Sequence, residues 1–254
     1  MSENNLRYNN ILKILMSFGK LMIQSGAEIN RVEDTVNRVG MSYEISKISV
    51  FAITTNLVIT IVDSDGHSYT RSKRIVSSAT TDFTKLELLN SLSRAKCNGE
   101  IDDDEFEKRF LEIKNFKESN FKFYIGSMIS AGSFTIFFGG DILDALVAVL
   151  FSLLIFLIED KFKEYCPNIM MFNFITAFVV GLGISVVSLF FSLNADKIVI
   201  GDIMLLIPGV AFTNSMRNLL VGDTLAGVMR LVETILWAAA LAVGFVLSMM
   251  IVGV

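Results

Sequence analysis

Cysteine and histidine are scarce in this chain, whose 254 residues include two cysteines and one histidine. Cys97 and Cys166 lie far apart in the sequence, so they form neither a CxxC redox pair nor a zinc cluster. Both are expected to be free thiols in a reducing compartment. No HExxH or other metal motif surrounds His67, and we expect it to be solvated beside a turn. The sequence therefore predicts no metal and no cofactor.

Motifs of catalysis are missing as well. The chain has no phosphate-binding glycine loop and no GxSxG sequence to mark a nucleophile. A Ser/His/Asp triad stays open, because its members need not be adjacent in the sequence. On balance the sequence predicts a protein that is not an enzyme.

A surplus of positive charge is also absent. The 22 Lys/Arg and 26 Asp/Glu residues give a formal net charge of −4, so nucleic acid is not expected as a partner. Residues 1–120 hold 16 Lys/Arg and 17 Asp/Glu, whereas residues 121–254 hold only 6 and 9. The mean hydropathy of +0.57 is too high for an ordinary soluble domain. We therefore expect a water-facing domain at 1–118 and a transmembrane domain at 119–254.

The first domain is predicted to be a cytoplasmic α+β domain. The first residues lack the basic and apolar regions of a signal peptide. Apolar residues spaced three and four apart predict a helix that ends at Gly26 and a second helix over about 27–41. Residues 47–54 and 56–62 are rich in β-branched side chains and precede a turn signal, which predicts a small sheet with a hairpin. Two further helices are expected, the last capped by Asp102.

The second domain is predicted to be an α-helical, polytopic membrane domain with about five transmembrane helices. A span needs roughly 20 mostly apolar residues. Five such windows lie at about 121–139, 142–159, 169–193, 198–218 and 224–252. Glycines in the third and fifth windows, among them Gly181 and Gly244, are expected to let helices pack closely.

The orientation of these spans follows from the cationic residues near their ends. With the first domain inside, most of these residues fall on the cytoplasmic side. They are Lys114, Lys117, Lys122, Lys161, Lys163, Arg217 and Arg230. Lys197 alone falls outside. The predicted topology places the N-terminus in the cytoplasm and the C-terminus outside.

The fourth span contains a helix-breaking pair, Pro208 and Gly209. Proline has no backbone N–H, and its ring clashes with the carbonyl four residues earlier, so we expect a kink or break there. Backbone groups freed inside a membrane are tolerated where they line a wet cavity, as in transporter substrate sites. A purely structural kink is the alternative. Polar residues in the same span favour a substrate site, namely Asp202, Thr213, Asn214, Arg217 and Asn218.

Two acidic residues are candidates for coupling transport to protons. Glu233 in the fifth span is the leading candidate, because ionisable groups at membrane depth often serve as proton relays. It lies three residues after Arg230, so a structural ion pair is the alternative. Asp202 is the second candidate, with a solvated position near the outer interface as its alternative.

Three segments together resemble a known family. They are Gly26-Ala-Glu-Ile-Asn-Arg-Val-Glu-Asp34, the Pro208-Gly209 span, and Gly222-Asp-Thr-Leu-Ala-Gly-Val-Met-Arg-Leu-Val-Glu233. In order and spacing these segments are similar to the bacterial threonine/serine exporter family. The closest likeness is to the larger, YjjP-like subunit of its split form. The resemblance covers nearly the whole chain.

The resemblance implies a multi-pass exporter in the bacterial inner membrane. It implies efflux of threonine and serine, or of dicarboxylates such as succinate for the split relatives, driven by the proton-motive force. A separate small membrane subunit is implied as a partner beside the lipid bilayer and the small-molecule substrate, and a homo-oligomer stays open. Relatives often carry Asp where this chain has Asn218, so coupling by the family's usual route is in doubt here.

The matching residues of the first domain are Gly26, Glu28, Arg31 and Glu33, and Asp223 belongs to the third matching segment. A local ion pair between Glu28 and Arg31 would explain two of them structurally, and a gate or subunit contact would explain them functionally. For the whole chain, the alternative to an exporter is a membrane-anchored sensor or scaffold whose cytoplasmic domain binds a ligand. A channel also stays open, because sequence does not distinguish gated diffusion from alternating access.

Overall fold

The computed structural model describes most of the chain. The described residues are 3–43, 45–75, 81–116, 120–162, 165–166 and 168–253. The predicted boundary between residues 118 and 119 lies outside them, as do Lys117 and Lys163 of the orientation argument. The chain forms two compact units. The first consists of Met1–Glu118 and Val210–Leu231, and the second of Ser119–Gly209 and Val232–Val254.

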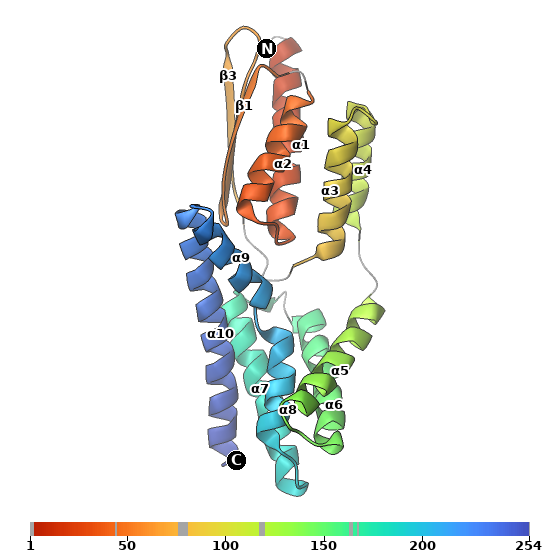
Figure 1. Ribbon diagram of the computed structural model, residues 1–254, viewed down its shortest axis with the longest axis vertical. Coiled ribbons are helices and arrows are strands. Elements are labelled where there is room, and N and C mark those ends of the chain that lie inside the picture. The colour runs from red at the N-terminus through yellow and green to blue at the C-terminus, as the bar shows by residue number, and fades with distance from the viewer. Residues whose placement is uncertain are drawn as a thin grey trace. The chain divides into compact units, whose positions relative to one another are not determined.

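The first unit contains the predicted small sheet. Its strands β1 (Lys47–Ile53), β2 (Asn56–Val62) and β3 (Ser68–Arg74) are antiparallel and lie in chain order (Figure 1). The link between β2 and β3 holds the predicted turn, so the hairpin prediction is confirmed. The register places Val50 opposite Ile59, and Ile59 opposite Arg71.

Helices complete the first unit. They are α1 (Glu3–Gln24), α2 (Ile29–Met41), α3 (Phe83–Cys97) and α4 (Asp103–Asn115), together with α9 (Gly209–Leu220) from its second residue onward and the start of α10 (Thr224–Val252). The predicted cap is confirmed, because the Asp102 carboxylate accepts the Glu105 N–H at 2.8 Å. The start of α4 therefore follows from the local chemistry of a helix N-cap.

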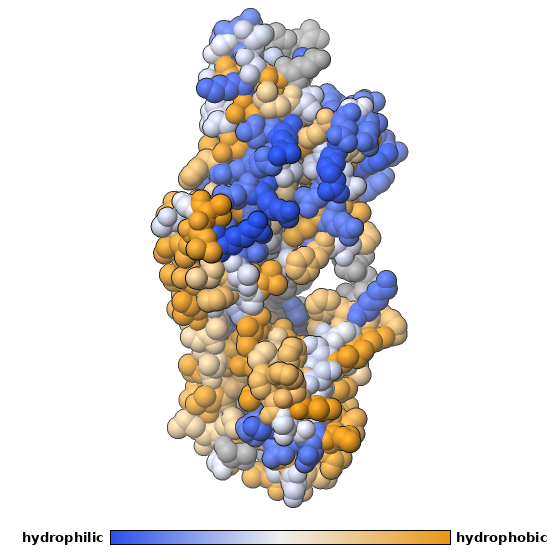
Figure 2. Space-filling model, in the orientation of Figure 1, coloured by the Kyte–Doolittle hydropathy of each residue, from blue (hydrophilic) through white to orange (hydrophobic). Residues whose placement is uncertain are grey.

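One hydrophobic core holds the first unit together. Alternate side chains of β2 face the helices, as the two-residue period of a strand requires, and the apolar stripes of α1 and α2 cover them. The fully buried members of this core include Leu15, Phe18, Val32, Val36, Leu57, Ile59 and Ile61. Figure 2 shows hydrophilic residues over much of the surface of this unit.

The second unit is made of helices with apolar outer surfaces. Its own helices are α5 (Asn120–Phe137), α6 (Ile142–Phe162), α7 (Ile169–Phe190) and α8 (Ala195–Leu206), and α10 continues into it. Large apolar side chains such as Leu150, Phe190 and Met250 are mostly exposed, and Figure 2 shows orange surface over these helices. Such an exposed surface would be unstable in water but suits contact with lipid.

The structure supports three or four of the five spans that the sequence suggested. Among the described residues α6, α7 and α10 are long and apolar enough to cross a membrane, and α8 with α9 makes a fourth candidate if that bent pair is one span. The predicted first span forms as α5, but its 18 residues include Lys122 and several glycines and serines. The structure thus supports three or four spans in a mainly helical membrane protein, and five stays a prediction.

Small residues let these helices approach one another, as predicted for Gly181 and Gly244. A Cβ on Gly181 would lie 3.0 Å from the Phe245 ring, and one on Gly244 would lie 2.7 Å from the Phe174 carbonyl oxygen. Gly201 on α8 is similar, because a Cβ there would overlap the Thr135 hydroxyl and lie 2.8 Å from the Ala131 carbonyl oxygen. The contact between α5 and α8 therefore depends on glycine.

Replacing Gly201 by alanine is expected to destabilise the second unit by about 1–3 kcal/mol, because a backbone carbonyl cannot yield to the added methyl group. Gly126 on α5 provides the control, since a Cβ there would meet nothing within 4 Å. Thermal unfolding of the detergent-purified chain should show a lower melting temperature for Gly201→Ala and an unchanged melting temperature for Gly126→Ala. Equal melting temperatures would contradict close packing at Gly201.

Candidate functional site

The predicted helix break lies where the sequence placed it. Helix α8 ends at Leu206, and α9 begins at Gly209. The pair is bent by 56°. Pro208 donates no backbone hydrogen bond, and the Gly209 N–H reaches the Ile207 carbonyl at 2.8 Å instead of one four residues back. The break is therefore a direct consequence of the proline.

Asp202 lies about one helical turn before this break, on α8. Its side chain is fully buried, and neither carboxylate oxygen has a hydrogen-bond partner among the described residues. This burial argues against the alternative of a solvated carboxylate near an interface. An ionised carboxylate in such a place is strongly disfavoured unless a proton or another cation joins it.

Helix α9 presents its small and polar side inward. Ala211, Ser215 and Asn218 are buried, whereas the large apolar Phe212 and Leu220 are exposed, together with Thr213 and Arg217. This is the reverse of a helix on a soluble protein, whose apolar stripe faces the core. It suits a helix whose outer side touches lipid and whose inner side lines a polar site.

The Gly26 motif forms the turn between α1 and α2. Gly26 has a φ of 87°, its N–H bonds the Ile23 carbonyl, and the Ala27 N–H bonds the Met22 carbonyl. This is the Schellman arrangement that ends helices, and its left-handed residue is usually glycine. A Cβ at Gly26 would also lie 2.8 Å from the Thr81 hydroxyl. The turn fixes where α2 begins, at Ile29, three residues after Gly26.

Glu28 follows this turn and pairs with a residue 189 positions away in the sequence. It occupies the N-cap of α2, but its side chain makes no capping hydrogen bond. Instead its Oε1 accepts a hydrogen bond from Arg217 Nη1 of α9 at 2.7 Å. The local pair with Arg31 is not formed, and Arg31 is exposed. The long-range contact replaces it.

A second turn of the same kind ends α9. Gly222 has a φ of 89°, its N–H bonds the Leu219 carbonyl, and the Asp223 N–H bonds the Asn218 carbonyl. Asp223 directly precedes α10, and its carboxylate accepts the Ala226 N–H at 3.4 Å. The two matching turns bring the residues of the third sequence segment beside those of the first.

Glu33 of α2 interacts with β1 and with the charge of Asp223. Its carboxylate accepts the Ala52 N–H of β1 at 2.7 Å. Burial raises the pKa of Glu33 above its ordinary value, the Ala52 hydrogen bond opposes the rise, and the negative charge of Asp223 adds to it. Glu33 is thus held between β1 and the start of α10.

A small polar cavity lies at the centre of these contacts. It is lined by Ile23, Gly26, Ala27, Glu28, Ile29, Thr54, Asn214, Asn218 and Arg230. Its volume of about 20 Å³ has room for about one water molecule. Thr54 is almost fully buried, and its hydroxyl has no hydrogen-bond partner among the described residues. The cavity therefore contains an unsatisfied polar group beside groups of both charges.

The structure brings together most of the sequence-predicted residues, but not all. Gly26, Glu28, Asn214, Asn218 and Arg230 line the cavity, Arg217 bonds one of them, and Glu33 lies near Asp223. Asp202, Pro208, Gly209 and Glu233 belong to the second unit. Sequence reasoning missed Thr54, because a threonine at a strand end carries no distinguishing pattern.

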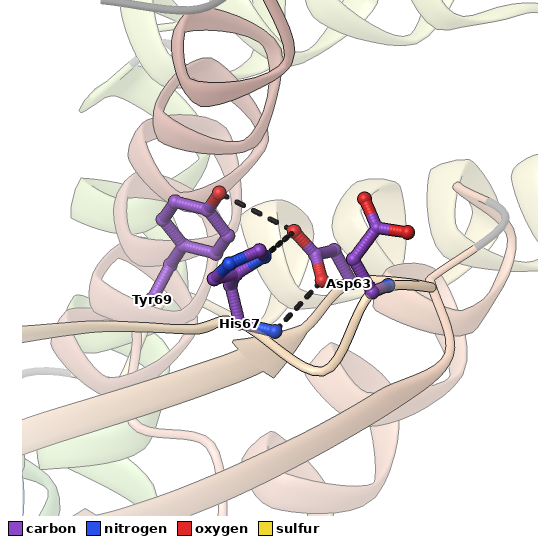
Figure 3. Close-up of polar contacts among 4 residues, drawn as sticks. Asp63, His67 and Tyr69 are labelled. Atoms are coloured by element: carbon purple, nitrogen blue, oxygen red, sulfur yellow. Dashed lines mark hydrogen bonds and ion pairs between the residues drawn. The ribbon is translucent and has the colours of Figure 1, made fainter.

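The lone histidine also has a partner. His67 Nδ1 lies 3.4 Å from Asp63, whose carboxylate also accepts the backbone N–H groups of Asp65 and His67 and the Tyr69 hydroxyl (Figure 3). Burial works against ionisation of Asp63, but these contacts together lower its pKa. His67 is exposed, as expected, yet not merely solvated. Because both Asp63 oxygens already accept hydrogen bonds, we interpret the cluster of Asp63, Asp65 and His67 as a stabilised turn.

Comparison with known proteins gives one match. The model of a family described as "Putative threonine/serine exporter" matches residues 13–252. No curated protein and no solved structure matches the chain.

Glu33 generates a pH-dependent prediction. Its folded-state pKa lies above the ordinary 4.5, so its contribution to stability is complete below that value and is lost as the pH rises through the folded-state pKa. Glu33→Gln keeps an acceptor for Ala52 and removes the charge. It is expected to raise the melting temperature at about pH 7 and to leave it unchanged at about pH 4.

The exposed Glu87 of α3 provides the control, Glu87→Gln, which should change the melting temperature at neither pH. Scanning fluorimetry of the full chain at both pH values measures the effect. A Glu33→Gln variant that melts lower than the wild type at pH 7 would contradict the burial argument.

Proposed function

The chain belongs to the threonine/serine exporter family, and from this premise we propose that it is the larger subunit of a proton-coupled exporter of small amino acids. The family is one of membrane transporters, and the apolar helices agree with a multi-pass membrane protein. The bacterial inner membrane, with the N-terminus in the cytoplasm and the C-terminus outside, is the proposed location.

One observation carries the mechanism more than any other. Asp202 holds two buried carboxylate oxygens without hydrogen-bond partners among the described residues, about one turn before a helix break. A carboxyl group in this position is favoured when protonated. If the site opens alternately to the two sides, Asp202 takes up a proton from outside and releases it to the cytoplasm. Each cycle then couples proton entry to substrate exit.

Glu233 is the second coupling candidate. It is only half-buried on α10 and lies three residues after Arg230, so its charge has access to solvent or to a nearby cation. Burial without hydrogen-bond donors makes Asp202 the stronger of the two. Glu233 is proposed to assist by moving protons to or from the site.

The broken helix supplies the other part of a transport site. Pro208 and Gly209 leave backbone groups outside the regular helical pattern, and such groups can bind substrate where they line a cavity. Asn214, Arg217 and Asn218 follow on the next half-helix. Asn218 stays uncharged at every pH, so it cannot carry the proton, and this supports assigning coupling to Asp202.

Threonine and serine are the proposed substrates, and succinate is the alternative. A separate small membrane subunit is proposed as partner, and assembly of several copies is compatible with it. Exporter-deficient cells preloaded with labelled threonine, serine or succinate test these points. Efflux that requires co-expression of a candidate small membrane protein would support the two-component form, and efflux of succinate alone would overturn the amino-acid proposal.

Asp202→Asn is expected to abolish net threonine efflux driven by a proton gradient, because the amide cannot take up and release a proton. Exchange of internal labelled threonine for external unlabelled threonine should persist, since exchange needs no net proton movement. Efflux and exchange from proteoliposomes, with the partner if one is required, separate the two effects.

Asp196 lies at the start of the same helix, is exposed and pairs with Lys197. Asp196→Asn is therefore the matched control and should keep both activities. Gradient-driven efflux by Asp202→Asn at the wild-type rate would refute the coupling role.

The proposed orientation is tested with cysteines. Cys97 is exposed in the first unit, and Ser192 is exposed between α7 and α8. In intact cells a membrane-impermeant maleimide should label Ser192→Cys in a cysteine-free background and should leave Cys97 of the wild type unlabelled until the membrane is opened. The reverse pattern would invert the topology.

A further inference from the structure

The cavity of the first unit has the chemistry of an amino-acid site. Its lining includes the Glu28 carboxylate and the Arg230 guanidinium, which match the ammonium and carboxylate of a free α-amino acid. Glu28 and Arg230 are both largely buried, at 16% and 9% exposed, so their charges are only weakly screened. The side-chain amides of Asn214 and Asn218 complete the polar lining.

Two further features of the cavity are suited to a ligand. Thr54 is only 4% exposed, and its buried hydroxyl has no hydrogen-bond partner among the described residues, although buried hydroxyls are rarely left unpaired. The N-terminus of α2 also borders the cavity, through Glu28 and Ile29. Glu28 does not cap this helix with its side chain, so its first N–H groups can attract a carboxylate.

We propose that this cavity binds the zwitterion of a hydroxyl-bearing α-amino acid from the cytoplasm. Glu28 holds the ammonium group, Arg230 and the N-terminus of α2 hold the carboxylate, and the amides with Thr54 hold the side-chain hydroxyl. The inference deepens the proposed function, on which its choice of ligand rests, by giving the substrate a first binding site. A dicarboxylate fits poorly, because its second negative charge would face Glu28.

The Glu28–Arg217 ion pair keeps this site closed. In the present structure the cavity holds about one water molecule, so an amino acid enters only when the site widens. Arg217 occupies the Glu28 oxygen at 2.7 Å and is itself 62% exposed. A ligand ammonium group therefore competes with Arg217 for Glu28. Release of Arg217 would free α9 to move away from the Gly26 turn.

This competition predicts opposite effects from the two halves of one ion pair. Arg217→Gln leaves Glu28 free for the ligand, and threonine should bind about two- to fivefold more tightly, which is the range of a partly exposed ion pair. Glu28→Gln also breaks the pair but removes the ammonium partner, so threonine should bind at least about tenfold more weakly. A purely structural ion pair would respond in the same direction to both changes.

Equilibrium binding of labelled threonine to the purified full chain in lipid nanodiscs makes the measurement. The competing probes are serine, succinate and valine, which has the shape of threonine without its hydroxyl. Arg109→Gln is the matched control, because Arg109 forms an equally short ion pair with Glu105 on α4 at 2.7 Å and does not line the cavity. Each variant is first checked for a single monodisperse species.

Opposite shifts for Arg217→Gln and Glu28→Gln, an unchanged control, and competition by serine but not by valine or succinate are the expected results. Shifts in the same direction, or none, overturn the site. If cells export threonine but Glu28→Gln does not weaken threonine binding, the proposed site is overturned and the exporter proposal stays intact. Absence of both binding and export overturns the exporter proposal as well, and the cavity then holds only water.

Discussion

The missing N–H of Pro208 is the constraint on which the arrangement of the polar residues depends. Without a proline there, residues 195–220 would favour one continuous helix, whose side chains would follow one regular spiral. The proline ends α8 at Leu206 and lets α9 begin anew at Gly209. The two half-helices then belong to different units. Asp202 and Asn218, which the sequence placed in one span, therefore lie in different environments.

The environment of α9 explains the distribution of charge around it. Its buried residues are small or polar, and its exposed residues include large apolar side chains such as Phe212 and Leu220, which are stable where they meet lipid. The polar side then needs partners within the protein, and the turns at Gly26 and Gly222 provide them. Each turn ends a helix with a left-handed glycine, and an acidic residue follows within two positions, Glu28 after Gly26 and Asp223 after Gly222. Glu28 reaches Arg217, and Asp223 lies near Glu33.

Local features of the fold were predictable, whereas the partners of the site residues were not. The helix end at Gly26, the hairpin after β2, the Asp102 cap and the break at Pro208 depend on chemistry within a few residues, and sequence contains that information. The sequence did not predict Arg217 as the partner of Glu28, because helical spacing indicated Arg31 as its neighbour. The unsatisfied hydroxyl of Thr54 was not predicted either, since it results from packing between distant segments. The first predicted span forms a helix, α5, but its small and polar residues weaken its hydropathy, so its place as a span stays a prediction.

Under the proposed mechanism, the residue that takes the proton and the residues that bind the amino acid lie in different units, joined by the break between α8 and α9. Thermodynamic linkage then requires that the chain between these two sites transmit an effect from one to the other. If protonation of Asp202 changes the affinity for threonine, threonine must change the affinity of Asp202 for its proton by the same factor. A rigid continuous helix would hold both groups in one fixed relation, whereas a broken one has a joint that can adopt two arrangements. Under the proposed mechanism, release of Arg217 from Glu28 would make α9 a two-state element of this kind, with Pro208 as its hinge.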